Sequence, residues 1–373
     1  MALPALLVRH LPPAVVVLSL AACAVGPGAP RVLSSATIKA NPVARVEWIG
    51  GWDSAMATAI ATMERELGLP RFEVSLHLFP GREAFEAALV RSGYRSDFAR
   101  DTARTMTAIG GSRAVLVNEG NLVAAPWERR LGLLVHELAH SLQYELGGGQ
   151  RGTSDQWLRE GFAEWVSVCV LQGLEATSLD QTRQRALGRL RGRQRAGLPP
   201  LEQMLTFPQW VALGQGPHAG VVYDLAFAAV DFLIRRHGFT RVVRYFELFT
   251  GSADRVANFR AAFGEDLDDF ERAFREEVWP PRRSAGPGSG HVRVEEVHEV
   301  LDGHWLVEHG DARALQLDQQ RRVRVGGHHR HGQAGDPLAQ PRRHGDAVEA
   351  GHDQVDEGRV VFRRVRARQR IVG

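Results

Sequence analysis

The sequence of 373 residues is poor in lysine, in cysteine and in long apolar runs. Lys39 is its only lysine, so arginine supplies the remaining basic charge, a bias typical of a GC-rich coding sequence. Its two cysteines, Cys23 and Cys169, allow one disulfide at most and exclude the cysteine spacing of a zinc finger. A phosphate-binding glycine loop is also missing, and the net charge of +3 is small for this length. This charge argues neither for nor against nucleic acid, and no nucleic-acid partner is expected.

The first 22 residues contain an apolar run, Ala14 to Ala22, that follows Arg9 and His10. The run is shorter than the about 20 apolar residues that span a bilayer, and it is typical of an export signal. It ends in Leu20-Ala-Ala-Cys23, which resembles the lipobox of bacterial lipoproteins. The resemblance implies a lipid anchor on Cys23 at the bacterial cell envelope, at the outer membrane in a Gram-negative host. The alternative is an ordinary signal peptide in which Cys23 is incidental.

Two further features concern single segments. A lipidated Cys23 leaves Cys169 without a partner, and its apolar neighbours predict a small buried core residue. Six arginines between Arg183 and Arg195 form a basic stretch. We expect a solvated helix face there; the alternative is contact with anionic envelope polymers or lipid headgroups.

The apolar pattern places strands early in the chain and helices later. Residues 24–45, which include several glycines and prolines, are typical of a tether. The expected strands are 72–79 and 114–117, and the expected helices are 53–67, 82–90, 127–146, 155–173, 178–195, 217–237, 239–250 and 265–278. A strand-rich first part followed by helices indicates an α+β domain over residues 46–282.

The last 91 residues, 283–373, differ in composition from the rest of the chain. They hold nine of the fifteen histidines, for example in His328-His-Arg-His331, and few sustained apolar periods. This composition predicts disorder. Two alternatives are a reading frame that is shifted near its end and a tail that binds metal ions.

The motif with the clearest chemical meaning is His136-Glu-Leu-Ala-His140, within the helix expected over residues 127–146. A spacing of four residues puts both imidazoles on one helix face, where they can bind one metal ion. Neutral imidazole is a good zinc ligand, and Glu137 projects beside the pair. The alternative is a helix that contains two hydrogen-bonded histidines.

Two acidic residues on the next expected helix can complete such a site. A catalytic zinc usually has three protein ligands and leaves a fourth position for water. Glu160 and Glu164 lie one helical turn apart among apolar residues, and two acids on a buried face need a cation. With Glu160 as a ligand, Glu164 can accept the free ring N–H of a histidine and fix its tautomer. The alternative is a pair of solvated helix glutamates.

The combined pattern, His136-Glu-x-x-His140 followed by Trp-Leu-x-Glu160-Gly-x-Ala-Glu164, resembles the gluzincin metallopeptidases, especially the bacterial peptidase MA-like family. The resemblance implies a thermolysin-like catalytic domain that holds one Zn²⁺ through His136, His140 and Glu160. It also implies that Glu137 is the base that activates a zinc-bound water.

The resemblance covers about residues 46–280, and its later pieces are weak. A metzincin would need glycine and histidine where this chain has Gln143 and Leu146, so that class is excluded. In related gluzincins a tyrosine on a later helix stabilises the oxyanion. By position Tyr223 is the candidate for this role, with His218 a lesser one; the alternative for Tyr223 is a core aromatic.

These features together predict a zinc-dependent peptidase anchored at the bacterial cell envelope. Its substrate is expected to be a polypeptide bound along an edge strand, for which we take residues 114–117. One alternative is a catalytically silent binding or assembly lipoprotein with a peptidase fold. A third interpretation is a metal carrier that depends on its histidine-rich tail. The intact Glu137 favours the enzyme, because a scaffold needs no base.

Overall fold

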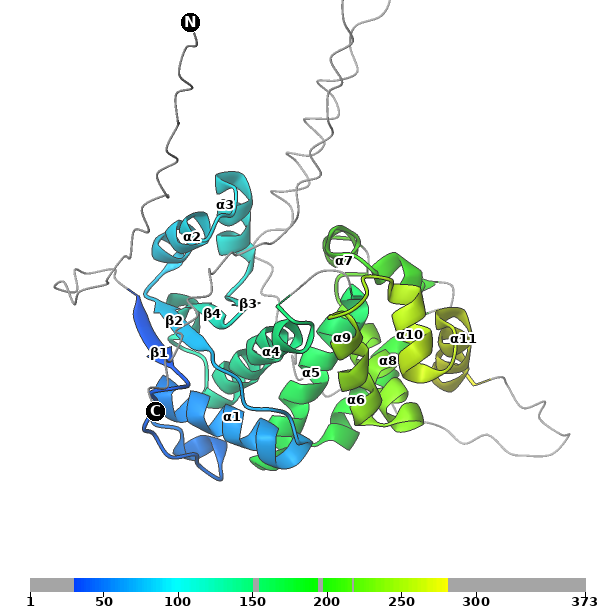
Figure 1. Cartoon of the computed structure of the whole chain (residues 1–373), viewed down its shortest axis with the longest axis horizontal. Helices are drawn as coiled ribbons and strands as arrows, with labels where there is room; N and C mark the ends of the chain where they lie inside the picture. Colours follow the sequence, from blue (N-terminus) through cyan, green and yellow to red (C-terminus); the bar gives the residue numbers. More distant parts are fainter. Residues whose placement is uncertain (1–29, 150–153, 194–196, 217, 281–373) are drawn as a thin grey trace, which may run out of the picture.

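The computed structural model describes residues 30–149, 154–193, 197–216 and 218–280. Within them the protein has the expected α+β architecture: a four-stranded sheet near the N-terminus is followed by a mainly helical part (Figure 1). The strands are β1 (Arg31–Ser34), β2 (Ser75–Phe79), β3 (Ala108–Gly111) and β4 (Ala114–Asn118). The helices are α1 (Trp52–Leu67), α2 (Arg82–Arg91), α3 (Ser96–Thr105), α4 (Trp127–Leu146), α5 (Gln156–Gly173), α6 (Leu179–Arg191), α7 (Phe207–Gly214), α8 (Val222–His237), α9 (Phe239–Leu248), α10 (Arg255–Phe263) and α11 (Leu267–Val278).

The sheet has the strand order β1-β2-β4-β3. Its two central strands, β2 and β4, are parallel, and each edge strand is antiparallel to its neighbour. Leu116 of β4 lies opposite His77 on one side and Ile109 on the other. The expectation that residues 114–117 form an edge strand is therefore wrong. The edge beside β4 is β3, a short strand that ends in two glycines and has little strand propensity of its own.

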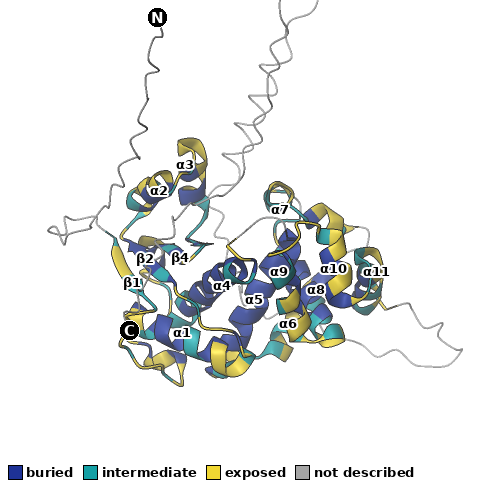
Figure 2. Cartoon of the chain, viewed as in Figure 1, coloured by how far each residue is buried: buried dark blue, intermediate teal, exposed yellow. Residues whose placement is uncertain are grey.

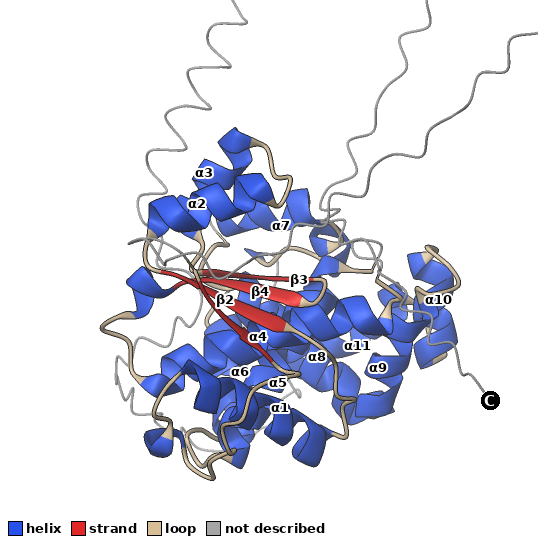
Figure 3. Cartoon of the chain, turned by 60° about the vertical axis from the view of Figure 1, so that its left-hand side comes forward, coloured by secondary structure: helices blue, strands red, loops and turns tan. Residues whose placement is uncertain are grey.

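The two faces of the sheet pack against different helices. Alternate side chains point to opposite faces, so Leu76 and Val115 enter the main core beside α1 and α4. Phe79 and Leu116 face the other way, toward Phe85 and the rest of a small core under α2 and α3. Figure 3 shows this arrangement, with α2 and α3 on one side of the sheet and α1 and α4 on the other.

Helices α4, α5 and α8 form the buried centre of the helical part (Figure 2). Two glycines allow a close approach around them. A Cβ at Gly161 of α5 would lie 2.2 Å from the carbonyl oxygen of Ala226 on α8. A Cβ at Gly110 of β3 would lie 2.3 Å from the carbonyl oxygen of Glu137 on α4. Any larger residue at either position would push these elements apart.

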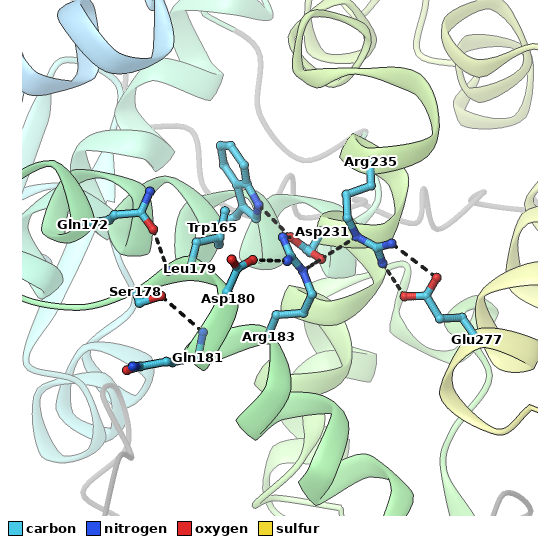
Figure 4. Close-up of polar contacts among 10 residues, drawn as sticks. All are labelled: Trp165, Gln172, Ser178, Leu179, Asp180, Gln181, Arg183, Asp231, Arg235 and Glu277. Carbon is cyan, nitrogen blue, oxygen red and sulfur yellow. Dashed lines mark hydrogen bonds and ion pairs between the residues drawn. The ribbon is translucent and has the colours of Figure 1, made fainter.

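A buried ion cluster joins α5, α6, α8 and α11 (Figure 4). Its centre is Asp231, whose side chain is 2% exposed. The Asp231 carboxylate accepts hydrogen bonds from Trp165 (3.2 Å), Arg183 (2.6 and 2.9 Å) and Arg235 (3.0 Å). Arg235 also pairs with Glu277 on α11. The negative charge at the centre therefore has two positive partners, as a buried charge requires.

The periodicity of the sequence predicted the long helices better than the short elements. Helix α4 has the expected bounds, and α5 begins one residue later than expected. Residues 31–34, expected within a tether, pair with β2 as strand β1. The structure also contains three helices that the pattern did not predict, namely α3, α7 and α10.

The remaining expectations have mixed outcomes. Cys169 is buried, as expected, and burial raises the pKa of its thiol to about 12. In the basic stretch, Arg185, Arg189 and Arg191 are exposed, as expected for a solvated helix face. Arg183 is only 22% exposed and pairs with Asp231, and Arg189 also pairs with Asp224. Cys23 and the tail over residues 283–373 lie outside the described residues. Of the helices in the described part of the chain, none combines the length and apolar character needed to cross a membrane.

Candidate metal centre

Helices α4 and α5 bring together the three residues expected to bind zinc. His136 and His140 are one turn apart on α4, so both rings leave the same face of the helix. Helix α5 crosses this face and adds Glu160. All three residues are buried, and one potential ligand atom from each lies within 4.8 Å of the other two. Two segments separated by 19 residues of sequence thus form one cluster.

The distances within the cluster describe a compact set of donors. The two Nε2 atoms of His136 and His140 are 3.0 Å apart. Oε2 of Glu160 lies 3.4 Å from the first of these nitrogens and 3.5 Å from the second. Two imidazole nitrogens and one carboxylate oxygen are the donor set found at catalytic zinc sites. The residues present therefore fit a metal ion.

Glu137 lies next to the cluster, on the side that faces the sheet. Its Oε2 would be 3.0 Å from a Cβ at Gly110, so the carboxylate lies against the edge strand β3. The side chain is buried, and it is not one of the three residues whose donor atoms cluster. A carboxylate beside the donor cluster can exchange a proton with a molecule bound there.

Glu164 contacts Nδ1 of His136, the ring nitrogen that is not part of the donor cluster. Its Oε1 lies 3.3 Å from Nδ1 of His136, which is the arrangement that the four-residue spacing from Glu160 led us to expect. Burial acts to lower the pKa of His136, but hydrogen bonds to Glu160 and Glu164 raise it well above its usual value. Burial acts to raise the pKa of Glu160, and the charge and hydrogen bonds of both histidines hold it well below its usual range.

Two glutamines that the sequence analysis did not connect with the site also contact its ligands. Oε1 of Gln143 lies 3.1 Å from Nδ1 of His140, and Nε2 of Gln156 donates to Oε1 of Glu160 over 2.6 Å. Their spacing provided a signal: each glutamine is three or four residues from the ligand that it contacts, on the same helix. In the sequence alone, Gln143 serves only to exclude a metzincin.

Tyr223 lies in the first turn of α8, the helix that packs against α5 beside the cluster. Its ring makes an edge-to-face contact with Trp210, with 4.9 Å between the ring centroids. Burial, followed by the negative charge of Glu160, raises the pKa of Tyr223 well above its usual value. His218 lies in the turn before α8, where its carbonyl oxygen accepts from the Val221 amide. The roles of both residues stay predictions.

Comparisons of the chain with family models, with curated proteins and with solved structures found no match. The class of site is therefore defined by its own residues. His136, His140 and Glu160 form a buried cluster with the spacing of an HExxH…E metal-binding motif. This cluster is compatible with a zinc peptidase, and its donor atoms identify it as a candidate metal centre.

Proposed function

We propose that the protein is a zinc-dependent peptidase of the gluzincin type that acts at the bacterial cell envelope. The observation that carries the proposal is the buried His136–His140–Glu160 cluster, with the carboxylate of Glu137 close to Gly110 of the edge strand β3. In this proposal His136, His140 and Glu160 hold one zinc ion. Zinc bound by such a donor set polarises a carbonyl oxygen and lowers the pKa of a water molecule.

The other residues of the site have separate tasks in the proposed reaction. Glu137 accepts a proton from the attacking water and passes it to the leaving nitrogen, which is the usual work of a carboxylate base in peptide hydrolysis. Tyr223 donates a hydrogen bond to the oxyanion that develops on the substrate carbonyl. The effect of the Glu160 charge on the pKa of Tyr223 supports this task, because it shows that the phenol lies near the cluster.

The proposed substrate is a polypeptide bound in an extended conformation along β3. We expected residues 114–117 to bind the substrate, but they belong to β4, which has neighbours on both sides; β3 is the edge strand beside it. Among the described residues, β3 pairs only with β4, so its second edge can accept main-chain hydrogen bonds. Glu137 lies directly against this strand at Gly110, next to where the scissile bond would be held.

The location and the anchor are part of the same proposal. The lipobox-like sequence that ends at Cys23 supports attachment of lipid to that residue and retention of the protein on the envelope. A Cys23→Ser variant expressed in a bacterial host should leave the membrane fraction. Mass spectrometry of the purified wild-type N-terminus checks the modification itself; an unmodified mature N-terminus at another residue would remove the anchor from the proposal.

A digest of a peptide library tests the catalytic part. The protein as isolated should cleave peptides, lose this activity after zinc is stripped by a chelator, and recover it when zinc is added back. The alternative, a silent lipoprotein with a peptidase fold, predicts that the protein binds zinc and cleaves nothing. Cleavage that persists without any metal would contradict both.

A further inference from the structure

We propose that Gln143 and Gln156 are positioning residues of the metal centre, and that Arg159 sets the direction in which both amides point. This inference rests on the metal centre proposed above. Arg159 is a buried arginine on α5, directly before Glu160 in the sequence. It contacts Gln156 through its guanidinium and Gln143 through its main-chain carbonyl. The guanidinium donates its hydrogen bond, whereas the carbonyl oxygen accepts one.

The guanidinium determines how Gln156 is turned. A guanidinium can only donate, so the Nη2 group of Arg159 requires the oxygen of the Gln156 amide. The NH₂ group of that amide must then point the other way, where it donates to Oε1 of Glu160 over 2.6 Å. With Oε1 occupied, Oε2 is the oxygen of Glu160 that faces the two histidines.

The main-chain carbonyl of Arg159 determines how Gln143 is turned. A carbonyl can only accept, so it requires the NH₂ group of the Gln143 amide, which donates to it over 2.9 Å. The amide oxygen is left facing Nδ1 of His140 at 3.1 Å, where it accepts the ring N–H. A proton on Nδ1 leaves the lone pair on Nε2, the nitrogen that lies beside His136.

One residue thus selects the binding atom of two separate ligands, one on each helix. His136 is positioned independently, because its Nδ1 faces Glu164. The guanidinium of Arg159 also adds one positive charge near Glu160. The site holds three carboxylates, those of Glu137, Glu160 and Glu164, and would bind a divalent ion. Each glutamine is buried and has no freedom to exchange its two contacts without breaking both.

Zinc binding to the full-length protein tests this inference. Gln143→Met and Gln156→Met keep approximate length and remove the amide. Each should weaken zinc binding by about 10–100-fold, the usual effect of losing a group that orients a metal ligand. Competition with a chromogenic chelator measures the affinity. The visible spectrum of the cobalt-loaded protein, which reports coordination geometry, should change in both variants.

Ser167→Ala is the matched control. It removes another buried hydrogen bond between the same two helices, from Ser167 Oγ to the carbonyl oxygen of Gly132 (2.9 Å). This variant should lower the midpoint of urea unfolding but keep the zinc affinity and the cobalt spectrum of the wild type. Should a methionine variant fail to fold, Gln143→Asn and Gln156→Asn keep a buried amide that is too short to reach the ligand, with the same expected loss.

Four outcomes are decisive. Folded glutamine variants with unchanged zinc affinity and cobalt spectrum would overturn the positioning role, as would an equal loss in Ser167→Ala. If the wild type binds zinc and the glutamine variants weaken it, but no peptide is cleaved, the positioning role stands and the proposed peptidase does not. A wild type that takes up no zinc would overturn both the positioning role and the proposed peptidase.

Discussion

Helix α5 takes part in two clusters with buried acids, one centred on Asp231 of α8 and one on its own Glu160 and Glu164, and they differ in how their charge is balanced. Asp231 receives two arginines and one indole N–H, so its carboxylate is fully paired inside the protein. The ion-pair partners that the structure provides for Glu160 and Glu164 are histidines, whose charge depends on a proton.

The difference separates a structural cluster from a functional one. Arginine keeps its charge at any physiological pH, so the Asp231 cluster needs nothing from outside the chain. Histidine is neutral when it binds a metal, so the second cluster contains acids that require an external cation. A buried acid therefore does not by itself identify a functional site. What identifies the site is whether the positive partner of the acid is arginine or histidine. Each prediction below perturbs one side of this comparison.

The largest effect is expected from Glu137→Gln. The substitution removes the proposed base and leaves the three ligands, so peptide cleavage should fall by on the order of 10²–10⁴-fold while zinc content is unchanged. Steady-state cleavage rates and metal analysis of the same samples measure both quantities. Glu145→Gln is the control on the same helix: Glu145 pairs with Arg113 at the surface, and its variant should retain wild-type activity.

The two glutamates of α5 should differ in their effect on zinc. Glu160→Ala removes a ligand and should allow the metal to be stripped under mild chelation. Glu164→Ala removes the partner of the His136 ring and should weaken binding by about 10–100-fold. Isothermal titration measures both affinities. If the Glu164 variant lost zinc outright and the Glu160 variant kept it, the two assignments would have to be exchanged.

Asp231→Asn perturbs the other cluster and should affect only stability. The amide keeps the shape of the side chain but leaves Arg183 and Arg235 with a weaker partner, at a cost of about 1–3 kcal/mol in the free energy of unfolding. Asp224→Asn disrupts a more exposed pair with Arg189 and should cost about 0–1 kcal/mol. Urea unfolding measures both, and neither variant should change zinc affinity. A loss of zinc binding in Asp231→Asn would show that the clusters are coupled.

The pH dependence of zinc binding tests the histidine side of the comparison. The folded-state pKa of His136 is raised, so its protonated form stabilises the metal-free protein fully below the unfolded value of about 6.5. This contribution is lost as pH rises through the folded value. Zinc requires the neutral ring, so its affinity should fall by about tenfold per pH unit below the raised pKa.

Glu164→Gln sharpens this test, because Glu164 is one of the groups that raise the pKa of His136. In that variant the fall in zinc affinity should begin at a lower pH than in the wild type. Chelator competition from about pH 8 to about pH 5.5 covers the range in which histidine titrates. Superimposable pH profiles for the two proteins would contradict the contact between Glu164 and His136.

The sequence could predict those parts of the site that depend on one helix at a time. The face shared by His136 and His140 follows from a spacing of four residues, and the bounds of α4 follow from its apolar period. The same rule relates Glu160 to Glu164. A spacing of three or four residues also places Gln143 near His140 and Gln156 near Glu160. Spacing alone, however, does not show which way an amide points.

What the sequence by itself determined is therefore local: the α+β order of elements, the long helices and the residues that share a helix face. Tertiary structure alone decided that β3 and not residues 114–117 lies at the sheet edge, because strand order depends on pairing between distant segments. It also decided how closely the elements meet, through Gly110 against α4 and Gly161 against α8. The contact of Arg159 with Gln143 also depends on tertiary structure, because only the crossing of α4 and α5 brings the Arg159 carbonyl to Gln143.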